Sequence, residues 1–134
     1  RKILLLASLW WLMTLGGTGA KTRVTIYLQP CNSIPTPSLL YLQHLITKTF
    51  GLESVILKPI KSNSTNAPNL IASTPHPHTL LITTSTLTDN TGAHILGLTI
   101  NLRSTITSRN LSTTNLGRLA LHEIAHTFGA SHCT

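Results

Sequence analysis

The chain has 134 residues and a formal net charge of +7, with only 10 basic and 3 acidic side chains. This length is enough for one small domain. The basic residues are scattered, without a run or an aromatic-interleaved patch, which argues against a nucleic-acid-binding protein. We expect a solvated surface to account for the charge, with a preference for acidic substrates or wall polymers as the alternative.

The first twenty residues have the three parts of a secretory signal peptide. A basic start at Arg1 and Lys2 precedes an apolar run over residues 3–15, and small residues follow up to Ala20. The run is shorter than the roughly 20 apolar residues that a membrane-spanning helix needs. We therefore expect residues 1–20 to be a signal peptide, with a retained membrane anchor or a buried core helix as the alternatives. Cleavage predicts a secreted, periplasmic or extracellular protein, and an uncleaved leader predicts one anchored to the membrane by this segment only.

Behind this leader, hydrophobic patterns predict strands and helices. Val24–Gln29 alternates apolar and polar residues, as a half-buried strand does. Two prolines then precede a helix over Ser38–Phe50, whose apolar residues recur every three or four positions, and Gly51 ends it. A second strand at Val55–Leu57 is stopped by Pro59.

The middle of the chain holds short elements separated by turns. Asn69–Ser73 fits a short helix, and Thr79–Thr84 is a third strand after the Pro-His turn at 75–78. We expect the two histidines of that turn to be exposed rather than to bind a metal. Two further strands are predicted at His94–Leu98 and Leu102–Thr107.

The last predicted element is a helix. It starts at Ser112 or Thr113, which are good N-caps, and runs to Phe128. Strand, helix, strand, strand and helix in this order predict an α/β (α+β) fold. Its sheet is expected to be mixed, mostly parallel and twisted, with about five strands and helices packed against it.

The closing helix carries a motif with metal-binding spacing, because residues 122–134 read H-E-x-x-H-x-x-G-x-x-H-C-T. Positions four apart lie on one face of a helix, so His122 and His126 can bind one metal ion. Gly129 allows the left-handed turn that ends a helix, after which His132 can approach the same ion from a loop. Three neutral imidazoles leave a fourth zinc position for water, which distinguishes a catalytic from a structural site.

Glu123 completes the expected chemistry. It lies one step around the helix from His122, where it can hydrogen-bond a zinc-bound water without binding the metal. Zinc lowers the pKa of that water towards about 7, and the glutamate can take its proton and pass it to the leaving amine. Glutamate is scarce, since Glu53 is the only other one. The position of Glu123 inside the motif therefore argues against a chance match.

The motif resembles that of the metzincin metalloproteases. The cysteine directly after the third histidine makes the chain similar to archaemetzincins in particular. Thr127–Gly129 matches the usual H-T-F-G of that family, and Arg118 lies where a basic residue is common. Val24–Pro30 looks like the first strand of the family.

This resemblance implies roles for individual residues. It makes His122, His126 and His132 the ligands of one catalytic zinc, and Glu123 the general base. Cys133 would be the first of four cysteines that hold a second, structural zinc.

The chain also departs from the family pattern. The other three cysteines and the methionine turn would lie beyond Thr134, and the only methionine is Met13 in the leader. We therefore expect residues 21–134 to be a metzincin-like catalytic domain that lacks its C-terminal subdomain, so a second zinc requires the full-length protein. In an exported chain, Cys31 and Cys133 can instead form a disulfide.

The resemblance also suggests where a substrate binds. In metzincins the edge strand beside the cleft lies antiparallel to the substrate and pairs with its backbone. The candidate strand precedes the last strand and the active-site helix, and consists of His94, Ile95, Leu96, Gly97 and Leu98. Such pairing gives affinity without side-chain specificity. An ordinary edge strand is the alternative interpretation.

Together these features predict a monomeric zinc-dependent metallopeptidase, an endo- or aminopeptidase, that acts on a peptide or protein. The alternative is a catalytically inactive zinc-binding module or a fragment of an exported protein. Glu123→Gln separates the two, since an enzyme loses turnover but keeps its metal, whereas a structural module loses nothing measurable.

Overall fold

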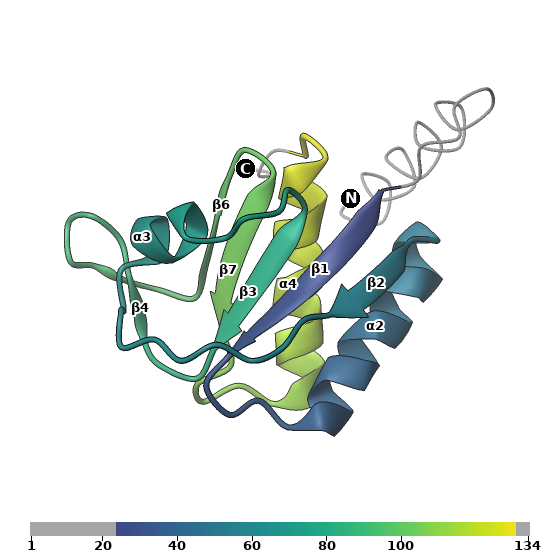
Figure 1. Cartoon of the computed structure of the whole chain (residues 1–134), viewed down its shortest axis with the longest axis horizontal. Helices are drawn as coiled ribbons and strands as arrows, with labels where there is room; N and C mark the ends of the chain where they lie inside the picture. Colours follow the sequence, from purple (N-terminus) through teal and green to yellow (C-terminus); the bar gives the residue numbers. More distant parts are fainter. Residues whose placement is uncertain (1–23, 131–134) are drawn as a thin grey trace.

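The structure is a computed structural model and describes residues 24–130. Its elements, in chain order, are β1 (Thr25–Cys31), α2 (Thr36–Phe50), β2 (Glu53–Ile56), α3 (Ala67–Ala72), β3 (Thr79–Thr83), β4 (Leu87–Thr88), β5 (His94–Ile95), β6 (Gly97–Ile100), β7 (Arg103–Thr107) and α4 (Thr113–Thr127). Five strands form one sheet in the order β2-β1-β3-β7-β6, and β4 pairs with β5 in a small separate sheet. Figure 1 shows α2 and α4 side by side along the large sheet, with α3 near β6 and β7.

The main apolar core lies between the large sheet and the two long helices. The strands contribute Ile26, Leu28, Leu80, Ile82 and Ile106, and the helices contribute Leu39, Leu42, Ile46, Phe50, Leu116, Ala120, Ile124 and Ala125. A smaller cluster consists of Cys31, Ala67, Leu70, Leu81 and Leu87 and covers the opposite face under α3. Because successive strand residues point to opposite faces, Leu80 and Leu81 of the central strand β3 enter different clusters.

Local sequence signals bound the two long helices. α2 has proline in its first turn and ends at Gly51, which has φ 68° and donates its N–H to the Thr47 carbonyl. α4 begins after Ser112, whose hydroxyl accepts the N–H of Asn115. The helix that carries the metal-binding motif is therefore set in place by its own N-cap.

The predicted fold class is confirmed. β1, β2, β3 and β7 are parallel to one another, and β6 alone is antiparallel to its neighbour in this sheet. Several boundaries move by two residues. α2 starts at Thr36 because proline is tolerated in a first helical turn, and α3 starts at Ala67 because Asn66 caps it.

The strand predicted over His94–Leu98 is wrong as a single element. Its first two residues form β5 and pair with β4, while Gly97 begins β6 and pairs with β7. Leu96 lies between the two strands, and its carbonyl accepts the N–H of Thr107. The chain therefore changes pairing partner at Leu96, from β4 of the small sheet to β7 of the large one.

Several expectations fall outside the described residues. The leader at 1–20, His132 and Cys133 all lie there, so export and the Cys31–Cys133 pairing stay predictions. Cys31 itself is buried at the end of β1. Within residues 24–130, no helix is both long and apolar enough to cross a membrane.

Candidate metal and active site

Two histidines of the motif converge on one point beside α4. His122 and His126 are one helical turn apart, and their Nε2 atoms lie 3.0 Å apart with the rings nearly perpendicular, at 88°. A tetrahedral zinc with bonds of 2.0–2.1 Å would separate two ligand nitrogens by about 3.3 Å. The pair therefore fits the donor chemistry and spacing of a zinc site.

The turn after α4 orients the second imidazole. His126 Nδ1 lies 2.6 Å from the carbonyl oxygen of Ala130, which Gly129 brings back towards the helix with φ 92°. A carbonyl oxygen only accepts, so His126 Nδ1 carries the proton. Its Nε2 is then the acceptor in the 3.0 Å contact with His122 Nε2, and in a metal-bound form the same lone pair would bind the metal, as in zinc-ligating histidines.

Glu123 is buried between α4 and the edge strand β6, with 6% of its surface exposed. Its Oε1 accepts the hydroxyl of Thr99 at 2.7 Å. The hydroxyl of Ser104, 2.8 Å from that of Thr99, then serves as donor, because Thr99 has a single proton to give. The carboxylate is thus held at the end of a series of two hydrogen bonds, from Ser104 to Thr99 and from Thr99 to Glu123.

The second carboxylate oxygen faces the histidines. Glu123 Oε2 lies 4.0 Å from His122 Nε2. On its other side is Gly97, where an added Cβ would lie only 3.1 Å from Oε2. The absence of a side chain at Gly97 therefore leaves room for the oxygen that faces His122.

The structure thus brings together His122, His126 and Glu123, three of the four central residues predicted from the motif. The fourth, His132, lies outside the described residues and stays a prediction. Within residues 24–130, no group of three or more histidine, cysteine, aspartate or glutamate side chains could hold a metal. A cavity of about 610 Å³ adjoins His126 and extends to Thr99 and Leu102.

Thr99 and Ser104 were not predicted as site residues, because no motif contains them. They become neighbours only through the antiparallel register of β6 and β7, in which Thr99 is opposite Ser104. Gly97 was predicted only as part of a substrate-pairing strand. Its contact with Glu123 could not be inferred from sequence spacing, since the two are far apart in the chain.

Comparisons with known proteins agree with this architecture. The crystal structure of an archaemetzincin from Archaeoglobus fulgidus, complexed with malonate, matches the chain with a TM-score of 0.73 and 23% sequence identity. The match covers 83% of this chain and 82% of that one. The chain has an archaemetzincin-like fold. The predicted resemblance is therefore confirmed for the fold, although no family profile and no curated protein matches the sequence.

Within this archaemetzincin-like fold, the site sits where α4 meets the edge of the sheet. α4 contacts both β6 and β7, and its imidazoles lie at its C-terminal end. β6 is the outermost strand on that side of the sheet. An extended molecule beside β6 would therefore pass next to Glu123.

Proposed function

We propose that this protein is a zinc-dependent metallopeptidase that hydrolyses peptide bonds with Glu123 as its general base. One observation carries the proposal. A buried carboxylate is held by a hydroxyl on one oxygen and presents the other to two imidazole nitrogens 3.0 Å apart. The archaemetzincin-like fold supports the same conclusion.

The metal would be held by Nε2 of His122 and His126, together with His132 as the expected third ligand. When bound, zinc supplies a Lewis acid that polarises a carbonyl and lowers the pKa of water. The hydrogen bond from His126 Nδ1 to Ala130 keeps that ring in the tautomer that such binding needs.

Glu123 would move the proton. Oε1 is occupied by the Thr99 hydroxyl, so Oε2 is the oxygen that can take a proton from the attacking water. The same oxygen can then return that proton to the leaving amine. Burial of the side chain keeps the carboxylate in this one orientation, which general-base catalysis requires.

A peptide substrate would pair with β6. The strand lies at the sheet edge, and within residues 24–130 it pairs with β7 alone, so its outer backbone groups can add a further strand. Of the predicted substrate-pairing segment, Gly97 and Leu98 lie on β6. His94 and Ile95 belong to β5 instead.

Two measurements on the purified full chain test this function. Metal analysis is expected to give about one zinc per chain, as a single catalytic site requires. Glu123→Gln is expected to keep the zinc and to lower kcat for peptide cleavage about 10²- to 10⁴-fold, the usual contribution of a general base. His122→Ala is expected to lose both zinc and cleavage.

The matched control is Glu53→Gln, because Glu53 is the only other glutamate and is exposed on β2. It is expected to keep both zinc and cleavage. A folded wild-type protein that binds no zinc, or a Glu123→Gln variant that cleaves like the wild type, would overturn the proposal.

A further inference from the structure

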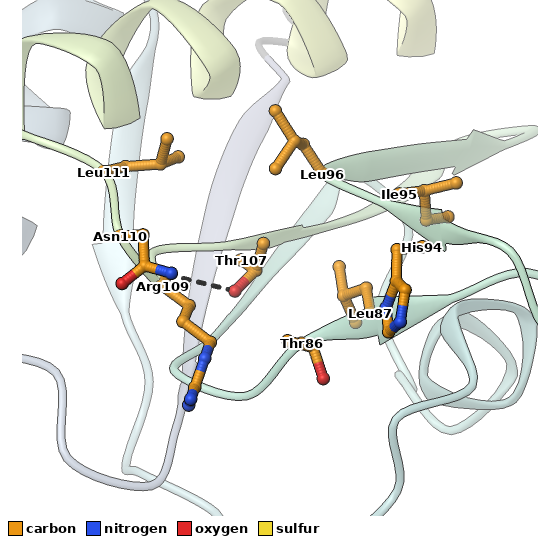
Figure 2. Close-up of a pocket in the computed structure, with 9 residues that line it drawn as sticks. All are labelled: Thr86, Leu87, His94, Ile95, Leu96, Thr107, Arg109, Asn110 and Leu111. Carbon is orange, nitrogen blue, oxygen red and sulfur yellow. Dashed lines mark hydrogen bonds between the residues drawn. The ribbon is translucent and has the colours of Figure 1, made fainter.

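A second cavity, of about 460 Å³, lies near the carboxyl ends of β3 and β7 (Figure 2). Thr107, the last residue of β7, lines it, and so do the apolar side chains of Leu87, Ile95, Leu96 and Leu111. Ligands of open α/β sheets bind outside the carboxyl ends of the parallel strands. This cavity occupies such a position and contains neither of the two paired imidazoles.

The ionisable residues that line the cavity are all basic. Arg109 and His94 are its ionisable residues, and no acidic side chain lines it. In Figure 2, Leu96 and Leu111 lie on the side of the yellow-green helix α4, whereas Arg109 and Thr86 lie on the side away from it. The backbone N–H of Arg109 donates to the Thr107 hydroxyl, and within residues 24–130 no hydrogen bond engages its guanidinium. The cavity therefore offers an apolar wall and, across from it, an exposed guanidinium that can turn towards an anionic group.

The cavity adjoins the proposed reaction centre through two consecutive residues. Leu96 lines the cavity, and Gly97, the next residue, is the one that contacts the Glu123 carboxylate. Leu96 is also 55% exposed, so it can contact a ligand. A strand advances about 3.3 Å per residue, so a peptide on β6 would reach the cavity about one to three residues from the cleaved bond.

The commoner mode of strand pairing favours one direction for the peptide. Antiparallel pairs outnumber parallel pairs roughly two- to three-fold. A peptide that is antiparallel to β6 has its C-terminal end beside the start of that strand, at Leu96. The part of the peptide that reaches the cavity is then the part downstream of the cleaved bond.

We propose that this cavity binds the C-terminal residue of a short peptide substrate. The apolar side chain of that residue packs against Leu96 and Leu111, and its α-carboxylate binds the Arg109 guanidinium. The inference rests on the proposed function for the position of the cleaved bond. It adds a substrate class, namely short peptides that end in an apolar residue with a free carboxylate.

Peptide binding to the zinc-loaded Glu123→Gln protein tests the inference without turnover. The probe is an N-terminally labelled pentapeptide of apolar residues ending in leucine, prepared as the free acid and as the C-terminal amide. Fluorescence anisotropy is expected to show that the acid binds at least about 10-fold more tightly, as charge-assisted hydrogen bonds do. Adding Arg109→Gln is expected to remove this preference. Arg109→Lys is expected to keep part of the preference for the acid, because lysine has the same charge but lacks the planar guanidinium that binds a carboxylate with two hydrogen bonds.

Arg118→Gln is the matched control. Arg118 is an exposed arginine on α4 that does not line the cavity, so this variant is expected to keep the full preference for the acid. Equal binding of acid and amide, a preference that survives Arg109→Gln, or no binding of either peptide would overturn the inference.

The two proposals fail in different ways. A wild-type protein that cleaves no peptide but keeps the acid preference would overturn the proposed function and leave the cavity as a binding site for a peptide C-terminus. A protein that cleaves amides as well as acids, with equal KM, would overturn the role of this cavity alone.

Discussion

At the scale of single residues, the two oxygens of Glu123 have different surroundings. Oε1 accepts the Thr99 hydroxyl, and Oε2 faces Gly97 and His122. A base is effective when its geometry is set before the reaction starts, by neighbours whose own positions are fixed. Thr99 is fixed by Ser104 and by the pairing of β6 with β7. In the proposed mechanism, Thr99 would therefore act through Glu123 as a positioning residue.

Removing the Thr99 hydroxyl is expected to lower turnover without removing the metal. Thr99→Val keeps the shape and the strand but deletes a charge-assisted hydrogen bond worth about 1.5–3 kcal/mol. We expect kcat to fall about 10- to 100-fold, with KM and zinc content unchanged, in steady-state kinetics with parallel metal analysis. Thr99→Ser restores the hydroxyl and should recover most of the loss. A kcat equal to that of the wild type in Thr99→Val would show that Glu123 needs no such support.

At the scale of elements, α4 carries both imidazoles and the carboxylate, so its position determines the site. The helix begins at Ser112, whose hydroxyl accepts the Asn115 N–H at 3.2 Å. Its inner face buries Leu116, Ala120 and Ile124 against the sheet. The cap sets where the helix starts, and the apolar face sets which side turns towards β6.

Loss of the cap is expected to destabilise the whole domain. Ser112→Ala leaves the Asn115 N–H without its acceptor and should lower the free energy of unfolding by about 1 kcal/mol in urea titrations. Ser112→Asp keeps an acceptor at the same position and should retain wild-type stability. Thr114→Ala, at an exposed position in the same turn, serves as a control for the loss of a hydroxyl. Equal stability of Ser112→Ala and the wild type would exclude this capping role.

At the scale of the whole molecule, His78 links the start of β3 to the end of α4. Its ring stacks on Phe128 with centroids 5.5 Å apart, and Phe128 in turn lies 6.1 Å from Phe50 of α2. His78 was predicted to be an exposed turn histidine, which is wrong, because the aromatic contact half-buries it. This burial, together with the positive charge of Arg103, lowers the pKa of His78 below its ordinary value.

The lowered pKa predicts how stability depends on pH. An unfolded histidine titrates near about pH 6.5, so below that pH the unfolded chain binds a proton that folded His78 resists. The free energy of unfolding is therefore expected to fall as pH drops from about 6.5 through the lower pKa of the folded state. Denaturant titrations of metal-free protein at a series of pH values measure this slope.

His78→Asn should make that slope shallower, because asparagine does not titrate and tolerates the φ of 58° found here. His44→Asn is the control, since His44 is exposed on α2, and it is expected to keep the wild-type slope. An unchanged slope in His78→Asn would rule out His78 as the titrating group.

The whole chain also shows which features can be predicted locally. Both long helices were predicted within two residues, because caps and three-to-four periodicity act within a few turns. The convergence of His122 and His126 could be predicted for the same reason, since a helix brings residues four apart together. The division of the predicted strand His94–Leu98 into β5 and β6 could not, because a strand boundary depends on its partner.

The sequence by itself determined the fold class, the helix that carries the candidate site, and the identity of the histidines and glutamate that lie on it. Only the tertiary structure decided which oxygen of Glu123 is held, which strand forms the edge, and that Leu96 and Arg109 line one cavity. The physical reason is the range of the interactions. Helical geometry is set by neighbouring residues, whereas strand register and cavities depend on contacts between segments far apart in the chain.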